Sequence, residues 1–404
     1  MVPRRLLAQQ NPDMWSDRNL ARIGDLSAPD ATLATFTVAG HVRRGLQAAG
    51  FAVERVPGFG RKRHRLEARR GREAGAERAT VRPIILGGGI AGASVAKAFL
   101  REGIVPTVVR APDHARTAAS ANPLAMVKPR LDKQDRSESR FFLQAYLHAL
   151  RAYPETCITH RGIRQVMRTE AERARFAAIA EQCALPSDQL RMDGNYAVFP
   201  QALVIDPVAA CEAFLEGAGI VEADVDTVQR TETGWSLVTN GKTIAEGTHL
   251  AIASGLDAKT RFPDLGLRAS RGQLSWAETV VNTPLAYGGY ALPSGKSTLL
   301  GATHERLTGD PYRLSTDDDV QNAAKILEAT GMAATDLSPA RASVRVTTAD
   351  TLPLVLDRGD SLHILTGLGS RGFTHAPLLG AEVASRILEI PRPLASDQAA
   401  KFSR

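Results

Sequence analysis

The sequence predicts an α/β protein that is built around a Rossmann-like nucleotide-binding domain. A short apolar strand over 81–86 runs into a glycine-rich turn and then into a helix that continues through Leu100. The segment 196–254 is rich in strand-forming residues and contains an Asn-Gly hairpin signal at 240–241. Apolar residues at 142, 145, 146, 149 and 150 recur at helical spacing and predict a packed helix. The segment 362–388 again has the order strand, glycine turn, helix. Strands that alternate with helices in this way are typical of a parallel sheet.

The size and composition of the chain fit a globular protein of two or three domains. Its 404 residues are 44% hydrophobic and 23% charged, which argues against a disordered, collagen-like or disulfide-rich chain. No run of about 18 apolar residues and no secretory signal is recognisable, so we expect a cytoplasmic protein without a membrane span. The net charge of +7 favours an anionic partner, with nucleic acid ahead of anionic lipid.

The cysteines indicate neither a disulfide framework nor a metal site. Cys157, Cys183 and Cys211 lie far apart, and no CxxC pair occurs. We therefore expect reduced thiols and no bound metal.

The first 70 residues predict a small α/β piece that is too short for an independent enzyme. A buried strand is expected over 32–37, a helix with a glycine stop over 42–50, and an alternating strand over 51–56. The basic stretch 61–72 indicates an exposed end that precedes a linker at 71–80. It is either a solvated charged strand or a nucleic-acid patch.

The glycine-rich turn carries the strongest chemical signal in the chain. Gly87 permits a tight turn, Gly89 lets the backbone approach a pyrophosphate, and Gly92 lets the helix pack against the sheet. The helix N-terminus adds free N–H groups for the phosphates. Because a strand precedes the turn and a helix follows it, we predict a dinucleotide site formed by Gly87, Gly88, Gly89, Ile90, Ala91 and Gly92.

Arg110 is a departure from the usual pattern of such sites. It occupies the end of the second strand, where an acid commonly binds the ribose hydroxyls. An arginine there could bind a 2′-phosphate, which favours NADP, or the site could bind FAD with its ribose held in another way. The glycine-rich turn alone does not separate these cofactors.

Two later turns favour FAD over a mobile nicotinamide. The strand 249–253 ends in the small residues Ser254 and Gly255, and the segment 366–377 opens a helix beside the end of a strand. Flavoproteins of the amine-oxidising type use a turn of the second kind to reach the flavin ring and its ribityl chain.

At this point a family resemblance can be stated. The chain from about Pro83 to Leu388 resembles the FAD-dependent oxidoreductase domain of the bifunctional tRNA wobble-uridine modification enzymes of the MnmC family, in the clan of glycine and D-amino-acid oxidases. The matching stretches are Gly87–Ala91, Ala119–Pro123, Arg140–Phe142, Phe199–Gln201, Arg271–Gln273, Leu300–Thr303, Val344–Pro353 and Gly367–Leu379.

The resemblance implies a D-amino-acid-oxidase-like fold, in which an FAD-binding Rossmann-like domain carries an inserted antiparallel substrate domain. The oxidoreductase domain would span 81–404. Its nucleotide part would comprise 81–130, 201–260 and 345–404, and its substrate part would comprise 131–200 and 261–344.

The N-terminal region is similar to the end of the same family's methyltransferase domain. The stretches that match are Asn11–Trp15, Thr32–Thr37, Val42–Leu46 and Gly58–Arg63. The family's S-adenosylmethionine site lies upstream of them, so the resemblance implies a truncated remnant over 1–70 and no methyl transfer. Met1–Gln10 does not match, and an upstream frameshift or a misassigned start is the hypothesis for it.

The resemblance also implies a reaction. The family substrate is a tRNA whose wobble uridine carries a carboxymethylaminomethyl arm. FAD-dependent oxidation of the arm's glycine methylene gives an imine, and hydrolysis of the imine leaves aminomethyl-uridine and glyoxylate. The implied partners are the modified tRNA and a separately encoded methyltransferase.

Residue by residue, the resemblance assigns Arg345 to the substrate carboxylate, with an ion pair to Asp350 or another core acid as the alternative. Arg271 would line the far side of the flavin and orient substrate, or simply brace the sheet. His375 would touch flavin or substrate, or have a packing or surface role. No general base is assigned. Besides the glycine-rich turn, the predicted cofactor-binding residues are Ser120, Asn122, Ser254, Gly255, Gly369, Ser370, Arg371, Gly372 and Phe373.

Two other functions stay open from the sequence. The chain could be a small-molecule glycine or amine oxidase on the same fold, or an inactive remnant that does not retain FAD. Lys128, Arg130 and Lys133 form one candidate tRNA-binding patch, and the arginines of 61–72 form the other.

Overall fold

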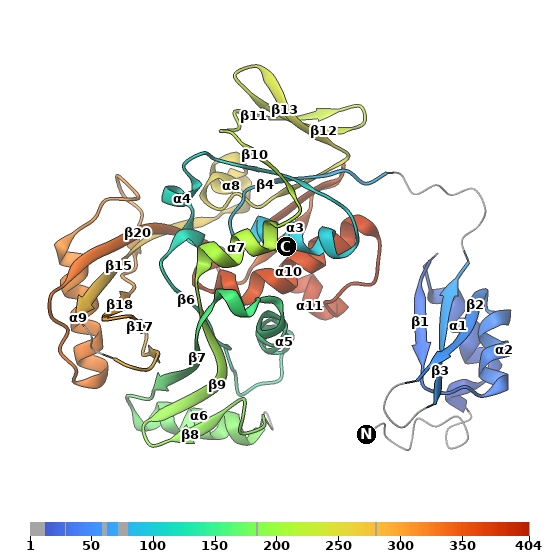
Figure 1. Cartoon of the computed structure of the whole chain (residues 1–404), viewed down its shortest axis with the longest axis horizontal. Helices are drawn as coiled ribbons and strands as arrows, with labels where there is room; N and C mark the ends of the chain where they lie inside the picture. The colour runs from blue at the N-terminus through green and yellow to red at the C-terminus, as the bar shows by residue number, and fades with distance from the viewer. Residues whose placement is uncertain are drawn as a thin grey trace. The chain divides into compact units, whose positions relative to one another are not determined.

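The computed structural model describes residues 13–28, 30–58, 63–71, 80–182, 185–278 and 281–403. The chain divides into two compact units, Met1–Ala79 with Glu389–Pro391, and Thr80–Leu388 with Arg392–Arg404 (Figure 1). Most of the linker predicted at 71–80, together with Cys183 and Met1–Gln10, lies outside the described residues.

The first unit is a small antiparallel sheet with two helices. Its elements are a 3-10 helix (Asp13–Trp15), α1 (Asp17–Leu26), β1 (Thr32–Thr35), α2 (Gly40–Ala48), β2 (Phe51–Pro57) and β3 (His64–Arg70), with strand order β1-β3-β2. A Cβ atom on Gly45 would lie only 2.4 Å from Leu20 Cδ1, so this glycine allows α1 and α2 to approach closely. The two strands and the helix expected from the sequence over 32–56 are present, and the first strand ends at Thr35.

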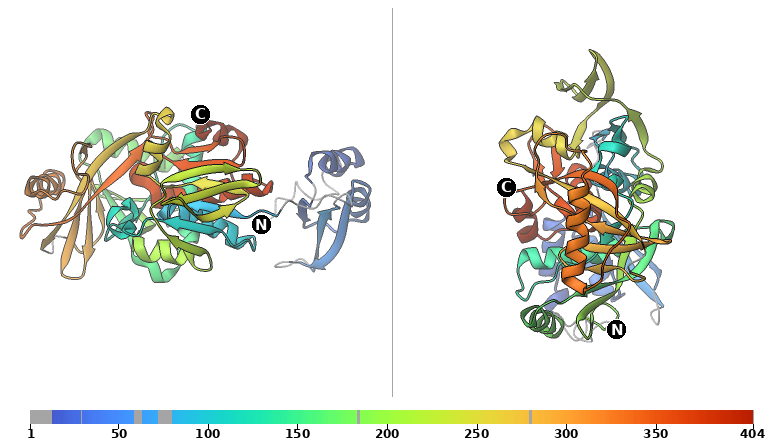
Figure 2. Two further views of the ribbon diagram at one scale, coloured as in Figure 1. Left: turned by 90° about the horizontal axis from the view of Figure 1, so that it is seen from above. Right: turned by 90° about the vertical axis from the view of Figure 1, so that its left-hand side faces the viewer.

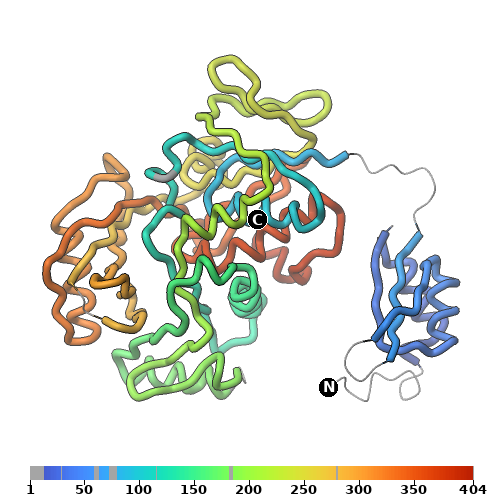
Figure 3. The backbone as a smooth tube through the Cα atoms, viewed as in Figure 1, coloured from blue at the N-terminus to red at the C-terminus, as the bar shows by residue number. Residues whose placement is uncertain are grey.

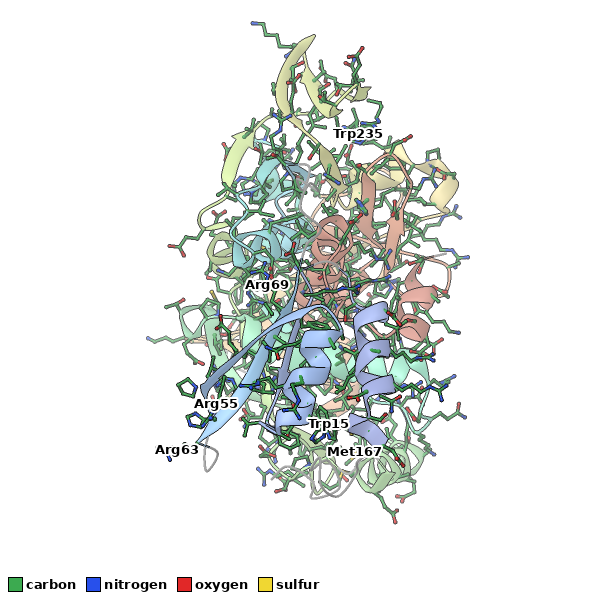
Figure 4. All side chains as sticks on the ribbon, turned by 90° about the vertical axis from the view of Figure 1, so that its right-hand side faces the viewer. Trp15, Arg55, Arg63, Arg69, Met167 and Trp235 are labelled. Carbon is green, nitrogen blue, oxygen red and sulfur yellow. The ribbon has the colours of Figure 1, made fainter. Side chains whose placement is uncertain are left out.

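The strand β3 occupies the middle of this small sheet. The sequence favoured an exposed basic end over 61–72 and kept a solvated charged strand as one alternative, and the structure has a strand at 64–70. Leu66 and Ala68 are buried on one face of β3, while their charged neighbours are partly or fully exposed. Figure 4 labels Arg63 near the turn of the β2–β3 hairpin and Arg69 toward its other end. Side chains alternate between the two faces of a strand, so two inward-facing apolar residues are enough to anchor β3. The many charged residues around them hide this pattern in the sequence.

The second unit contains a largely parallel sheet, here called the parallel sheet. Within the described residues its order is β10 (Gly219–Glu222), β5 (Thr107–Arg110), β4 (Pro83–Leu86), β14 (His249–Ile252), β22 (Leu362–Thr366) and β21 (Leu354–Asp357). All neighbouring strands run parallel except β22 and β21. Figure 3 shows how early, middle and late segments of the unit meet here.

Helices cover one face of the parallel sheet, and a small meander covers the other. The helix α3 (Ile90–Arg101) packs against α7 (Pro207–Leu215) and α10 (Gly372–Leu388). The meander consists of β11 (Thr227–Thr231), β12 (Gly234–Thr239) and β13 (Lys242–Gly247). Its Leu237 and Ala245 share an apolar core with Ile84 and Leu250. The indole N–H of Trp235, labelled in Figure 4, donates to the carbonyl of Asp360 at 2.9 Å.

The meander contains the predicted Asn-Gly hairpin. Asn240 and Gly241, which join β12 to β13, have φ values of 50° and 72°. Positive φ at both central residues is the geometry that this pair favours in a two-residue hairpin.

A second sheet, here called the mixed sheet, forms the rest of the unit. Its order among the described residues is β19 (Glu305–Arg306), β15 (Arg268–Glu278), β18 (Ser297–Gly301), β17 (Tyr290–Ser294), β16 (Leu285–Ala286), β7 (Ile158–Val166), β9 (Tyr196–Ile205) and β6 (Ala125–Val127), with β20 (Ser338–Thr347) on β15 and β8 (Arg191–Asp193) on β9. The pairs are antiparallel except β16 with β7.

Helices flank the mixed sheet. The helix α9 (Thr316–Thr330) packs on β15, β18 and β20, and the right-hand view of Figure 2 shows it in front of these strands. The helix α5 (Ser137–Ala152) buries the apolar stripe predicted from its spacing and packs against α10. The remaining helices are α4 (His114–Thr117), α6 (Glu170–Gln182), α8 (Leu256–Arg261), α11 (Ser396–Phe402) and the 3-10 helices Ala119–Ala121, Glu155–Cys157, Pro263–Leu265 and Gly369–Arg371.

Candidate active site

The glycine-rich turn joins β4 to α3 at the carboxyl edge of the parallel sheet. Gly87 has a φ of 117°, and a Cβ atom there would lie 2.4 Å from the carbonyl oxygen of Ala253. A Cβ atom on Gly92 would lie 1.8 Å from the carbonyl oxygen of Gly87. Only glycine therefore allows β4, β14 and the first turn of α3 to meet this closely.

The start of α3 is braced by Ser120. The Ser120 hydroxyl accepts a hydrogen bond of 2.9 Å from the N–H of Ile90, which is one of the donors that a helix leaves without an internal partner. Two residues further on, the buried Oδ1 atom of Asn122 has no hydrogen-bond partner among the described residues. The segment thus fixes the helix end and presents an unused acceptor beside it.

Two other turns reach the same edge of the sheet. Gly255, with a φ of 58°, begins α8 after β14, and Gly369, with a φ of 56°, follows β22 before α10. The buried hydroxyls of Ser254 and Thr366 have no hydrogen-bond partner in the described part of the chain. Unsatisfied buried polar groups of this kind require an explanation, and a polar ligand provides one.

A cavity of about 1100 Å³ connects these turns with the mixed sheet. Every residue predicted to bind the cofactor lines it except Gly92, which packs beneath the turn. Arg345 lines it, and Arg271 does not. Such a volume exceeds that of a typical drug-sized pocket and accommodates an extended ligand.

Arg110 lines the cavity but is already engaged by two carboxylates. Its guanidinium donates to Glu212 at 2.7 Å and to Glu222 at 3.0 Å. Burial opposes its charge, but the two hydrogen-bonded glutamates outweigh that effect and raise its pKa. The partners of Arg110 weaken the reading in which it binds a 2′-phosphate. Glu222, on the adjacent strand β10, is the register partner of Arg110. An acid is therefore present near this strand end, although it comes from a different strand than in the usual pattern.

Arg345 projects from β20 into the cavity. Its guanidinium donates to the carbonyl of Thr303 at 2.6 Å and forms no ion pair among the described residues, so the alternative pairing with Asp350 does not occur there. A Cβ atom on Gly272 would lie 1.7 Å from Arg345 Nη2, so this glycine leaves the space that the guanidinium fills. Burial lowers the pKa of Arg345, and the same cause raises the pKa of nearby Tyr290 to about 12.

Arg271 and Arg345 lie on the paired strands β15 and β20, one position out of register. Because successive side chains of a strand point to opposite faces of the sheet, the two arginines point to opposite faces. Its side chain is 2% exposed, donates to Asp318 at 2.8 Å and also pairs with Glu305. These contacts join β15 to α9 and β19. The structure therefore places Arg271 as a brace of the sheet, away from the cavity.

His375 also lies away from the cavity. It is buried against the rings of Phe141 and Phe142, with centroid distances of 5.2 and 5.5 Å. Burial, followed by the charges of Arg371 and Arg130, lowers its pKa to about 3. The packing alternative, rather than contact with a flavin, describes its position.

Sequence reasoning missed several residues that line the cavity. Gln165 enters from β7, Arg175 from α6 and Lys325 from α9. Lys325 donates to the carbonyl of Ala302 at 3.0 Å, beside the loop that receives Arg345. No local motif marks these positions, because only the path of the mixed sheet brings them to one wall.

The described residues contain no cluster of three or more His, Cys, Asp or Glu side chains suited to a metal ion. Among the same residues, no helix is both long and apolar enough to cross a membrane. Cys157 and Cys211 are buried free thiols, and burial raises the pKa of both.

The arrangement fits a flavin dinucleotide. The glycine-rich turn and the N-terminus of α3 offer a phosphate site. Asn122, Ser254 and Thr366 offer unused polar atoms along the cavity wall. Gly369 and Gly372 also line the cavity, at the start of the helical segment that leads into α10.

Comparison with known proteins agrees with this geometry. Residues 83–386 match the family model of the FAD dependent oxidoreductases, and residues 8–71 match that of an S-adenosyl-L-methionine-dependent methyltransferase. Among solved structures, the chain is similar to iminodiacetate oxidase from Chelativorans sp. (TM-score 0.65, 18% identity, 80% of this chain and 98% of that one). It is also similar to glycine oxidase from Geobacillus kaustophilus (TM-score 0.62, 20% identity, 80% of this chain and 98% of that one).

The curated relatives are more similar in sequence. The tRNA 5-methylaminomethyl-2-thiouridine biosynthesis bifunctional protein MnmC of Caulobacter vibrioides is 38% identical over 407 residues, covering 95% of this chain and 67% of that protein. The protein of the same name from Maricaulis maris is 37% identical, covering 94% and 65%. The chain thus spans about two thirds of the length of these relatives. It belongs to the FAD-dependent oxidoreductases, in the family of the bifunctional protein MnmC, and its cofactor is FAD.

Proposed function

We propose that this chain oxidises the carboxymethylaminomethyl arm of a tRNA wobble uridine, with or without the 2-thio group, to the aminomethyl form and releases glyoxylate. The observation that carries the proposal is Arg345, a cavity-lining guanidinium without a carboxylate partner among the described residues. Its relatives of the MnmC family are named for biosynthesis of a tRNA uridine derivative, which supports the choice of substrate.

The proposed reaction balances as a two-electron oxidation of a C–H and N–H pair. The arm is a glycine attached through its nitrogen. It loses a hydride from the methylene carbon and a proton from the nitrogen, and a C=N bond forms. Water adds to this imine, the C–N bond breaks, and the products are a primary amine and glyoxylate. Bound FAD supplies the two-electron acceptor.

The residues of this chain would orient the arm and shield it. Arg345 can hold the carboxylate through two parallel hydrogen bonds, which fixes the methylene carbon relative to the cavity wall. Lys325 adds positive charge close to Arg345. Burial is the main cause of the lowered pKa of Lys325, and repulsion by the Arg345 guanidinium is the second. The Thr303 carbonyl holds the guanidinium in place when no carboxylate is present.

The proposal is tested on purified, FAD-loaded protein incubated with tRNA that bears the carboxymethylaminomethyl group. Mass analysis of the digested nucleosides should show loss of the carboxymethyl mass, and glyoxylate should appear in equal amount. Turnover of free glycine, sarcosine or iminodiacetate, without conversion of the tRNA, would instead identify a small-molecule amine oxidase. A protein that refuses FAD would be the inactive remnant.

Two finer points stay predictions. We expect no methyl transfer from S-adenosylmethionine by this chain, and we expect a separately encoded methyltransferase to act on the aminomethyl product. Adding labelled S-adenosylmethionine to the same incubation tests the first point, because methylated product would contradict it.

A further inference from the structure

Three cations come from the segment that follows β6 and from α6, and we call them the basic cluster: Lys128, Arg130 and Arg175. All three line the cavity. None of them forms an ion pair in the part of the chain that the structure describes. By contrast, Arg110, Arg168 and Arg261 line the same cavity, and each pairs with a carboxylate.

The contacts of the basic cluster orient its members without neutralising them. Lys128 donates to Gln165 Oε1 at 3.0 Å and lies 5.0 Å from the centroid of Phe199. The guanidinium of Arg130 lies 4.6 Å from the ring of Phe142. Arg175 donates to a backbone carbonyl, that of Leu131, at 3.1 Å. Amide oxygens and aromatic rings position such groups, but their positive charge remains available.

The cluster runs from the surface into the cavity. Arg130 and Arg175 are exposed, whereas Lys128 is only partly so and its ammonium end is buried. Burial, followed by repulsion from Arg371 and Arg175, lowers the pKa of Lys128 to about 7. Anion binding would relieve this repulsion, because an opposite charge favours the protonated amine.

The two anions already assigned have other places. The cofactor pyrophosphate is expected at the glycine-rich turn, and the substrate carboxylate at Arg345. Arg345 stands on β20, which pairs with β15 near one end of the mixed sheet, while β6 is the last strand at the other end. The carboxylate site at Arg345 and the basic cluster are therefore separate places on the wall of one cavity, and a ligand long enough to reach both could contact both.

We propose that the basic cluster binds a backbone phosphate of the RNA beside the nucleotide whose side arm enters the cavity. This inference rests on the proposed function, since it assigns the nucleotide end of the same substrate. A phosphodiester carries one diffuse negative charge, and exposed arginines with a lysine are the usual groups that contact it.

The test measures RNA binding rather than turnover. FAD-loaded wild-type protein and the double variant Lys128→Gln/Arg175→Gln are titrated with a synthetic anticodon stem-loop RNA over a range of salt concentrations, with fluorescence anisotropy as the readout. We expect roughly tenfold weaker binding by the variant. The slope of log K against log salt should become shallower by about 0.7 for each lost contact to single-stranded RNA.

A matched control comes from the same helix. Arg173 lies two residues before Arg175, but it pairs with Glu170 at 2.7 Å and does not line the cavity. Arg173→Gln should bind the RNA as the wild type does. The FAD content of each protein, from its visible absorbance, should stay unchanged.

The outcomes separate the two proposals. Equal affinity and equal slope for wild type and double variant, with a wild type that converts modified tRNA, overturn this inference alone. Loss of FAD from the double variant also overturns it, because the cluster would then serve the cofactor. A wild type that neither binds the RNA nor converts the tRNA overturns both.

Discussion

The two walls of the cavity are built in different ways. The wall on the parallel sheet contains the glycines of its turns, such as Gly87, Gly255 and Gly369, whose positive φ values set these turns. The wall on the mixed sheet contains long cationic side chains without a carboxylate partner among the described residues, including Arg345 and Lys128. The first wall therefore depends on local backbone geometry. The second depends on the folding that brings side chains from distant parts of the sequence to the same cavity.

Under the proposed function, this difference suits separate roles for the two walls. Backbone N–H groups at a helix N-terminus suit the phosphate of a cofactor that stays bound while substrates come and go, because these groups cannot rotate away. Long side chains suit a substrate that enters and leaves, because they can be held by neutral partners such as the Thr303 carbonyl until the anion arrives. Each of the following predictions changes one part of this arrangement and states the expected loss.

The largest effect is expected from Gly92→Val. The added side chain would overlap the carbonyl of Gly87, so the turn and the first turn of α3 must separate. We expect a protein that purifies without FAD, measured by the ratio of visible to ultraviolet absorbance, or one that does not fold. Gly219→Ala, at a glycine whose added Cβ would meet nothing closer than 3.7 Å, is the control and should stay yellow.

The next effect is expected from Arg345→Gln. Loss of the carboxylate partner should lower kcat/KM for modified tRNA about 100-fold, which corresponds to roughly 3 kcal/mol of lost charge pairing. FAD content should stay at the wild-type level, and Arg345→Lys should fall between the two. Arg268→Gln, at an exposed arginine on β15, serves as the control. Full activity of Arg345→Gln would remove the carboxylate assignment.

A different kind of loss is expected from Arg271→Met. Removing this buried guanidinium leaves Asp318 and Glu305 without their partner, at a cost to unfolding free energy of about 3 kcal/mol. Thermal unfolding should report this cost as a lower Tm, while kcat/KM of the folded protein changes little. A variant with normal Tm and collapsed kcat/KM would contradict the bracing role.

The smallest effect concerns pH. Because the pKa of Lys128 is lowered to about 7, its ammonium is present below that pH and is lost as the pH rises. The groups facing this amine are Arg371, Arg175, the Gln165 amide and the Phe199 ring, none of them an acid. RNA affinity should therefore fall several-fold between pH 6 and 8, on the order of the change expected for one lost charge.

The conservative variant sharpens the pH prediction. Lys128→Arg keeps its charge across this range, so its RNA affinity should be nearly independent of pH. An identical pH profile for wild type and Lys128→Arg would show that another group titrates. The measurement is fluorescence anisotropy at constant ionic strength.

The sequence was a good guide where structure is local. The glycine-rich turn, the stripe of α5 and the Asn-Gly hairpin each occupy one short segment, and the structure has them as the spacing predicts. Arg271 shows the limit of this approach. Its sequence context allowed either bracing or substrate orientation, and the direction of its side chain depends on the alternation of β15 against α9.

The first unit gives a second example of that limit. The charged residues of β3 outnumber its apolar ones, so the sequence predicted an exposed basic end here, either a solvated charged strand or a nucleic-acid patch. Its place between β1 and β2 follows only from the pairing of three strands that the sequence separates. Pairing partners are set by tertiary contacts, which composition does not record.

The sequence by itself determined the glycine turns in the wall on the parallel sheet, because glycines and small polar residues act through backbone geometry that is encoded within a few residues. The tertiary structure alone decided which cations face the cavity free of a carboxylate partner in the described residues. Arg110 and Arg345 are both arginines at strand positions beside the cavity, yet neighbouring strands and helices supply glutamates to the first and only a carbonyl to the second. The charge of a guanidinium is local, but whether it remains available to a ligand depends on residues far away in the chain.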